Sequence, residues 1–89
     1  MDYSPGQHIL PEHLPAHQRA ILREVALAYR RAKRAGMAEH GCYEAALATY
    51  RRLDPKAAQD QIDASYQVGV MIAAAVNANV RWFWRGPDA

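Results

Sequence analysis

The sequence predicts an all-α protein: a compact three-helix domain with an irregular N-terminal arm and an aromatic C-terminal tail. Three observations carry this prediction. The 89-residue chain is 51% hydrophobic and 22% charged, which is the composition of one globular domain. Alanine is abundant while β-branched residues are few, which favours helix. Apolar residues also recur at helical spacing in three separate stretches.

The predicted organisation has an arm at residues 1–14 and a single helical domain at residues 15–89. Three prolines interrupt the arm and its border, so no long helix fits there. Its apolar residues indicate that the arm packs across the helices; they are Ile9, Leu10 and Leu14.

The first two helices are expected at about residues 15–35 and 39–53. Pro15 suits a first helical turn, and Gly36 is a natural C-cap. The first helix carries an apolar stripe on one side and a basic strip on the other side. The strip comprises Arg19, Arg23, Arg30 and Arg34, with Arg31 and Lys33 beside it.

The third helix is expected at about residues 55–78. Asp54 can cap this helix, and Pro55 fits its first position. The second half of the helix, "VGVMIAAAV", is apolar almost all round, which predicts burial on two sides.

Charge is distributed unevenly, although the net charge is only +2. Residues 15–36 carry +5, whereas residues 37–80 carry −2. Glu24 is the only acid in the first of these segments, while a face made only for solubility usually mixes signs. The basic face therefore makes nucleic acid a candidate partner.

A helix-turn-helix would use the second helix to read DNA, with the basic region of helix one beside it. Ala32 and Gly36 have the spacing of the small residue and the turn glycine in that motif. The early side chains of the second helix include two acids, Glu39 and Glu44, which disfavour contact with bases. We therefore rank DNA binding below protein binding.

The tail places large apolar side chains at Trp82, Phe83 and Trp84, between Arg81 and Arg85. Two indoles and a phenyl ring bury on the order of 500 Å². At ~25 cal/mol per Å² that burial is worth up to roughly 12 kcal/mol, so one or two rings should cap the core. Three consecutive residues cannot all face one core, and at least one ring should therefore point outward. Tryptophan and arginine are enriched in interface hot spots.

No residues with an arrangement typical of catalysis or cofactor binding occur in the sequence, and we expect no enzyme, no cofactor and no metal. His13 and His17 have a ligand-like spacing, but Pro15 lies between them. Cys42 is the single cysteine, so no internal disulfide forms. The longest apolar stretch is too short to cross a bilayer, and no signal peptide is apparent. We expect a cytoplasmic protein.

The stretches "YRRAKRAG", "YEAALATYRRLDP" and "MIAAAVNANVRWFW" resemble the small antiactivator proteins of rhizobial integrative and conjugative elements. The resemblance covers most of the chain after about residue 15 and rests on size and helical layout. It implies a role in quorum sensing and conjugative transfer. Such proteins bind activators of element transfer, including a LuxR-family activator, and keep them off their promoters. The resemblance assigns no individual residue.

The residues and the resemblance lead to one hypothesis, an antiactivator that binds a transcription activator through an aromatic and basic surface. The alternative is a helix-turn-helix DNA-binding protein, and a homodimer is a further candidate assembly. The residues expected to bind the partner are Leu27, Arg30, Arg31, Arg34, Arg81, Trp82, Phe83, Trp84 and Arg85.

Overall fold

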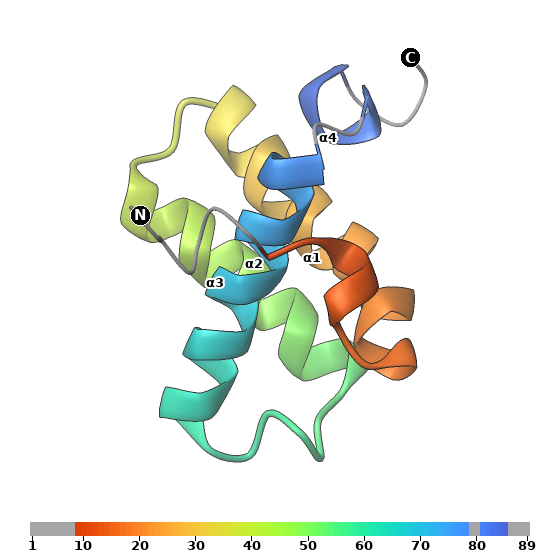
Figure 1. Ribbon diagram of the computed structural model, residues 1–89. Helices are drawn as coiled ribbons and strands as arrows, with labels where there is room; N and C mark the ends of the chain where they lie inside the picture. The colour runs from red at the N-terminus through yellow and green to blue at the C-terminus, as the bar shows by residue number, and fades with distance from the viewer. Residues whose placement is uncertain (1–8, 79–80, 86–89) are drawn as a thin grey trace, which may run out of the picture.

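Four α-helices and one short 3-10 helix form the part of the chain that the computed structural model describes, residues 9–78 and 81–85. These residues contain no strand, which confirms the predicted all-α class. Figure 1 shows α3 in the middle of the molecule, with the other long helices around it. None of the described helices is long and apolar enough to cross a membrane. The elements are η2 (Pro11–His13), α1 (Ala16–Arg34), α2 (Glu39–Leu53), α3 (Gln61–Ala78) and α4 (Arg81–Arg85).

α1 ends at Arg34 because the chain turns back in a Schellman motif. Gly36 has φ +88°, in the left-handed region that glycine adopts without steric cost. The Met37 N–H donates to the Ala32 carbonyl at 3.1 Å, and the Gly36 N–H donates to the Lys33 carbonyl at 3.1 Å. The predicted C-cap at Gly36 is therefore confirmed, and it directs the chain into α2.

Three hydrogen-bonded side chains fix the start of α2 against the end of α1. Glu39, the first residue of α2, accepts from the Tyr29 hydroxyl at 2.6 Å and from Lys33 Nζ at 2.7 Å. The hydrogen bonds from Lys33 and Tyr29 lower the pKa of the Glu39 carboxyl. The same carboxylate raises the pKa of Lys33. Burial and the hydrogen bond to Glu39 raise the pKa of the Tyr29 hydroxyl.

α3 begins at Gln61, later than the sequence predicts, and the prediction of a start just after Asp54 is wrong. Asp54 starts only a single turn, and Asp60 supplies the side-chain cap of α3. The Asp63 N–H donates to Asp60 Oδ1 at 2.9 Å. Both aspartates are suited to cap a helix, but the observed helix is capped by Asp60, and the turn between them places Ala58 in the core.

The core lies between α1, α2 and α3. α3 contacts α1, α2 and η2, which confirms the predicted burial of its apolar half on more than one side. Part of α3 nevertheless stays open, since Ile62 and Tyr66 are 81% and 68% exposed. The largest fully buried side chains of the described residues are Tyr50, Phe83, Met71, Val25, Val68 and Cys42.

The described part of the N-terminal arm, residues 9–14, crosses α3. Asn77 Nδ2 donates to the Ile9 carbonyl at 2.9 Å, and Leu14 is buried in the core. Arg19 Nη1 donates to the Leu14 carbonyl at 2.8 Å, which ties the arm to α1. The predicted packing of the arm across the helices is confirmed for this segment, and the rest of the arm lies outside the described residues.

Replacing Asp60 by alanine should lower the free energy of unfolding by about 1 kcal/mol, because the Asp63 N–H loses its acceptor. Urea unfolding followed by circular dichroism measures the loss. Asp54→Ala is the matched control, with a smaller expected loss, since the Ala57 N–H lies 3.3 Å from Asp54 Oδ1. A larger loss of unfolding free energy for Asp54→Ala than for Asp60→Ala would contradict the assignment of Asp60 as the cap of α3.

Acid should destabilise the protein partly through Glu39. The pKa of Glu39 is lowered from 4.5 in the folded state, so its stabilisation is present above that value and is lost as the pH falls through the folded pKa. Lys33 and Tyr29 have raised pKa values, so their contributions are lost only at alkaline pH. Glu39→Gln should flatten the fall in unfolding free energy between about pH 3 and 6. Equal slopes for both proteins would contradict this role.

Candidate functional site

The short helix α4 packs against α1 (Figure 1). Its three aromatic side chains lie in three different environments. Phe83 is 1% exposed and belongs to the core, Trp82 is partly buried against the core, and Trp84 is 41% exposed. Successive helical residues point about 100° apart, so one ring points inward and its neighbours diverge. The prediction that one or two rings cap the core while another faces outward is confirmed.

Phe83 contacts both indoles edge to face. The ring centroids lie 6.3 Å apart for Trp82 and 5.1 Å apart for Trp84, with interplanar angles of 78° and 89°. Such T-shaped pairs are favourable because the positive edge of one ring meets the negative face of another. Phe83 therefore connects the exposed indole to the core.

Three arginines of α1 contact α4. The Arg23 guanidinium lies 5.5 Å from the Trp82 ring centroid, and that of Arg30 lies 5.2 Å from the Trp84 ring centroid. Cation–π contacts of this kind contribute about 0.5–2 kcal/mol each. Arg34 Nη2 donates to the Trp84 carbonyl. The basic strip thus holds the aromatic helix in place.

Arg30 is the most enclosed of these arginines. Its guanidinium also lies 5.9 Å from the Phe83 ring centroid, and its Nε is buried without a hydrogen-bond partner. Aromatic faces surround this group where a carboxylate or a carbonyl would usually accept a hydrogen bond. The position of Arg30 therefore depends on α4, and α4 depends on Arg30.

No arginine among the described residues forms an ion pair with a carboxylate. The ion pairs found there join Lys33 to Glu39 and two histidines to acids. Arg31 and Arg81 are exposed. Unpaired positive charge therefore adjoins an exposed indole. We call this surface the Trp–Arg face and define it as Arg23, Arg30, Arg34, Trp82 and Trp84.

The prediction that Leu27 and Phe83 contact a partner is corrected by their burial. Leu27 is 3% exposed and Phe83 is 1% exposed, so neither side chain is available to a partner in the folded chain. The side chain of Arg85 lies outside the described part of the chain.

The sequence contains a signal for one further residue of this surface. Arg23 contacts Trp82 but is absent from the predicted partner-binding residues. Arg23, Arg30 and Arg34 are spaced so that they lie on one face of the helix. If Arg30 and Arg34 lie beside the tail, Arg23 is therefore expected to lie beside it as well.

Chemistry-bearing side chains are engaged in local structure. The residues that the structure describes contain no cluster of three or more His, Cys, Asp or Glu side chains that could hold a metal ion. Cys42 is fully buried, and its thiol donates to the Met37 carbonyl at 3.5 Å. His13 Nδ1 accepts from the Leu10 N–H at 3.1 Å.

Comparison of the chain with protein-family models, with curated proteins and with solved structures found no match. A functional proposal therefore rests on the surfaces of this molecule. The Trp–Arg face is the surface at which burial, ring contacts and charge coincide.

Replacing Phe83 by alanine should lower the free energy of unfolding by about 3–5 kcal/mol, because a fully buried ring leaves a cavity. Trp84→Ala should cost less than about 2 kcal/mol, since that ring is 41% exposed and loses mainly its contacts with Phe83 and Arg30. Urea unfolding of both variants measures the difference. Equal losses would contradict the assignment of Phe83 as the anchor of α4.

Proposed function

We propose that this protein is a non-enzymatic regulator that binds and inhibits a transcription activator through the Trp–Arg face. The observation that carries the proposal is the exposed indole of Trp84, held in position by Phe83 and Arg30. Tryptophan beside arginine is the composition of interface hot spots. Because the ring is already fixed in the free protein, little side-chain entropy is lost on binding.

The partner that we propose is a LuxR-family activator, following the resemblance to rhizobial antiactivators. This proposal places the protein in the cytoplasm, in quorum sensing and in the control of conjugative transfer. Inhibition would need only a higher affinity for an activator state that does not engage its promoter, since differential affinity shifts the population. The unpaired arginines would speed encounter with an acidic surface of the activator.

DNA binding is the alternative, and the turn between α1 and α2 is the observation that favours it. Gly36 ends α1 with φ +88°, as a turn glycine does between two helices of a DNA-binding unit. Protein binding is favoured because Arg23 and Arg34 already contact α4, while the exposed start of α2 carries Glu39 and Glu44. Carboxylates at the start of a reading helix repel phosphates.

Replacing Trp84 by alanine should raise the Kd for a purified LuxR-family activator by about 30-fold or more, because a hot spot contributes at least ~2 kcal/mol. Isothermal titration calorimetry at about 0.15 M salt measures this change, and circular dichroism establishes that the variant is folded.

Ile62→Ala is the matched control, because Ile62 is an exposed apolar residue at the end of α3 that lies away from α4 (Figure 1). Its Kd should equal that of the wild type. An unchanged Kd for Trp84→Ala would contradict the proposal. Binding to a DNA duplex that weakens steeply with salt and tolerates Trp84→Ala would favour the alternative.

A further inference from the structure

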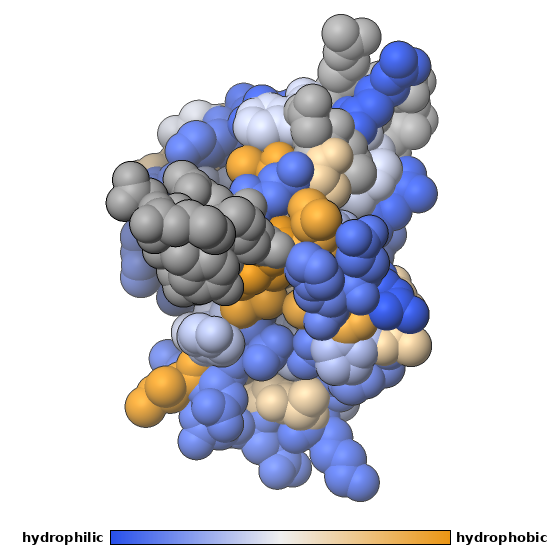
Figure 2. Space-filling view, in the orientation of Figure 1, coloured by the Kyte–Doolittle hydropathy of each residue, from blue (hydrophilic) through white to orange (hydrophobic). Residues whose placement is uncertain are grey.

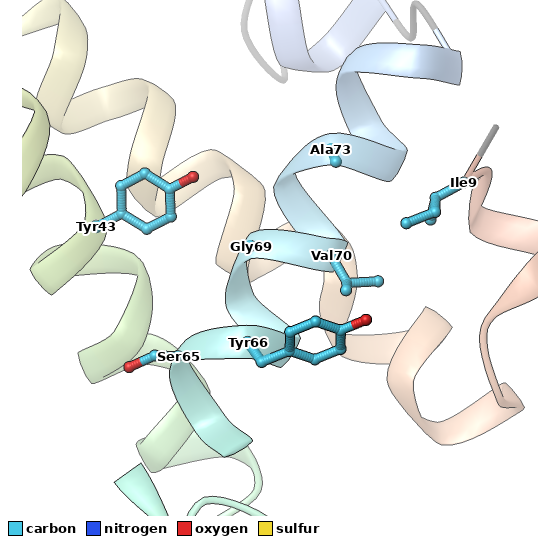
Figure 3. A pocket seen from close by; sticks show the side chains of 7 residues that line it. All are labelled: Ile9, Tyr43, Ser65, Tyr66, Gly69, Val70 and Ala73. Atoms are coloured by element: carbon cyan, nitrogen blue, oxygen red, sulfur yellow. The ribbon is translucent and has the colours of Figure 1, made fainter. Parts of the chain in front are cut away.

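An apolar groove runs along α3 between α2 and the N-terminal arm. Figure 3 shows Tyr43 of α2 on one side, Ile9 on the other side and the groove residues of α3 between them. Its volume is about 450 Å³. A second hollow of about 330 Å³ adjoins the first, since Ile9, Tyr66 and Val70 line both.

The groove lies on a face with exposed apolar side chains. Tyr66 is 68% exposed, and Tyr43 and Val76 are each 39% exposed. Figure 2 shows hydrophobic residues gathered at the middle of this face, with hydrophilic residues above, to the right of and below them. Contiguous exposed apolar surface with a polar rim is typical of an interaction site.

Gly69 forms part of the groove floor, and no packing contact within the chain requires a glycine there. Glycine in the middle of a helix costs about 0.5–1 kcal/mol relative to alanine. A Cβ at this position would meet no atom within 4 Å, so internal packing does not require glycine. Ser65 and Ala73 lie about one helical turn before and after Gly69 on the same face of α3, and their side chains are also small. The floor therefore admits the close approach of another helix.

The elements that line the groove are acidic. η2, α3 and the part of α2 before Arg51 contain Glu12, Glu39, Glu44 and Asp63, and they contain no lysine or arginine. All four acids are exposed, and one of them, Glu39, is paired with Lys33 of α1. The lysines and arginines of the described residues lie on α1, on α4, at the end of α2 and, as Lys56, in the connection between α2 and α3. Charge complementarity at the groove therefore favours a basic partner.

We propose that this groove is a second protein-binding site, which takes an amphipathic helix with an apolar stripe and basic residues along its edges. The stripe would pack between Tyr43 and Tyr66 over Gly69, in the helix-in-groove mode of recognition. Basic edge residues would meet exposed carboxylates of the elements that line the groove, such as Glu44 of α2 and Asp63 of α3. The site shares no residue with the Trp–Arg face and so goes beyond the proposed function.

The test is a titration of the ¹⁵N-labelled full chain with two synthetic helical peptides, one built of leucine and lysine and one of leucine and glutamate. The leucine–lysine peptide should shift the amide signals of Ser65, Tyr66 and Gly69. It should bind there at least about tenfold more tightly than the leucine–glutamate peptide, because the groove is acidic. Equal binding of both peptides, or no shift at these amides, would overturn the proposal.

Gly69→Leu should raise the Kd of the leucine–lysine peptide by about tenfold or more, because the new side chain fills the groove floor. The fold should be kept, since the Cβ enters open space. Arg31→Glu is the control on α1 and should not weaken binding. An unchanged Kd for Gly69→Leu would overturn the proposal.

Two other occupants of the groove would be recognised in the same spectra. Concentration-dependent shifts without peptide would assign the groove to a second copy of the chain. Nuclear Overhauser contacts from residues 1–8 to Tyr66 would assign it to the chain's own N-terminal segment. Either result would overturn the proposal.

Discussion

Burial of Phe83 is the contact on which the α1–α4 surface depends. A helix of five residues does not hold its conformation alone, because nucleation costs more than so few hydrogen bonds return. α4 must therefore be stabilised by its side chains, and Phe83 is the one that is fully buried in the core, with Trp82 partly buried against it. Once this ring is buried, helical geometry fixes the directions of Trp82 and Trp84. The exposure of Trp84 is thus a consequence of the burial of Phe83.

α1 has two packing surfaces, and this explains its unusual distribution of charge. One surface meets α2 and α3, and the other meets α4. The guanidinium groups of Arg23 and Arg30 lie over the rings of Trp82 and Trp84, so these cations pack against aromatic carbon. The same contacts leave these guanidinium groups without a carboxylate partner. The binding role that we propose therefore falls on arginines that also hold α4 in place.

The charges of the molecule are segregated between its two candidate surfaces. Arginines without a carboxylate partner lie beside the exposed indole where α4 meets α1. Exposed carboxylates lie on the elements that line the groove beside α3. Two partners of opposite charge, or two regions of one partner, would therefore be distinguished by electrostatics before apolar contacts form. Each surface also contains apolar side chains that remain exposed in the folded chain, which supplies affinity that charge alone would not.

The sequence predicts the helical class and the first two helices closely, because their apolar spacing and the Gly36 cap are local signals. It misplaces the start of the third helix, since Asp54 and Asp60 are both competent caps and the local pattern does not choose between them. The burial of Leu27 is set by tertiary packing, which no local pattern encodes. The groove likewise depends on the path of the arm and on the separation of α2 from α3.

Trp84 is exposed in the free protein, and we propose that it is covered in a complex with an activator. Trp82→Phe makes Trp84 the sole tryptophan, since the chain contains two. Acrylamide quenching of this variant, with and without a purified LuxR-family activator, measures the accessibility of that one indole. We expect efficient quenching in the free protein and strong protection in the complex. Equal quenching in a complex shown to have formed would contradict the account.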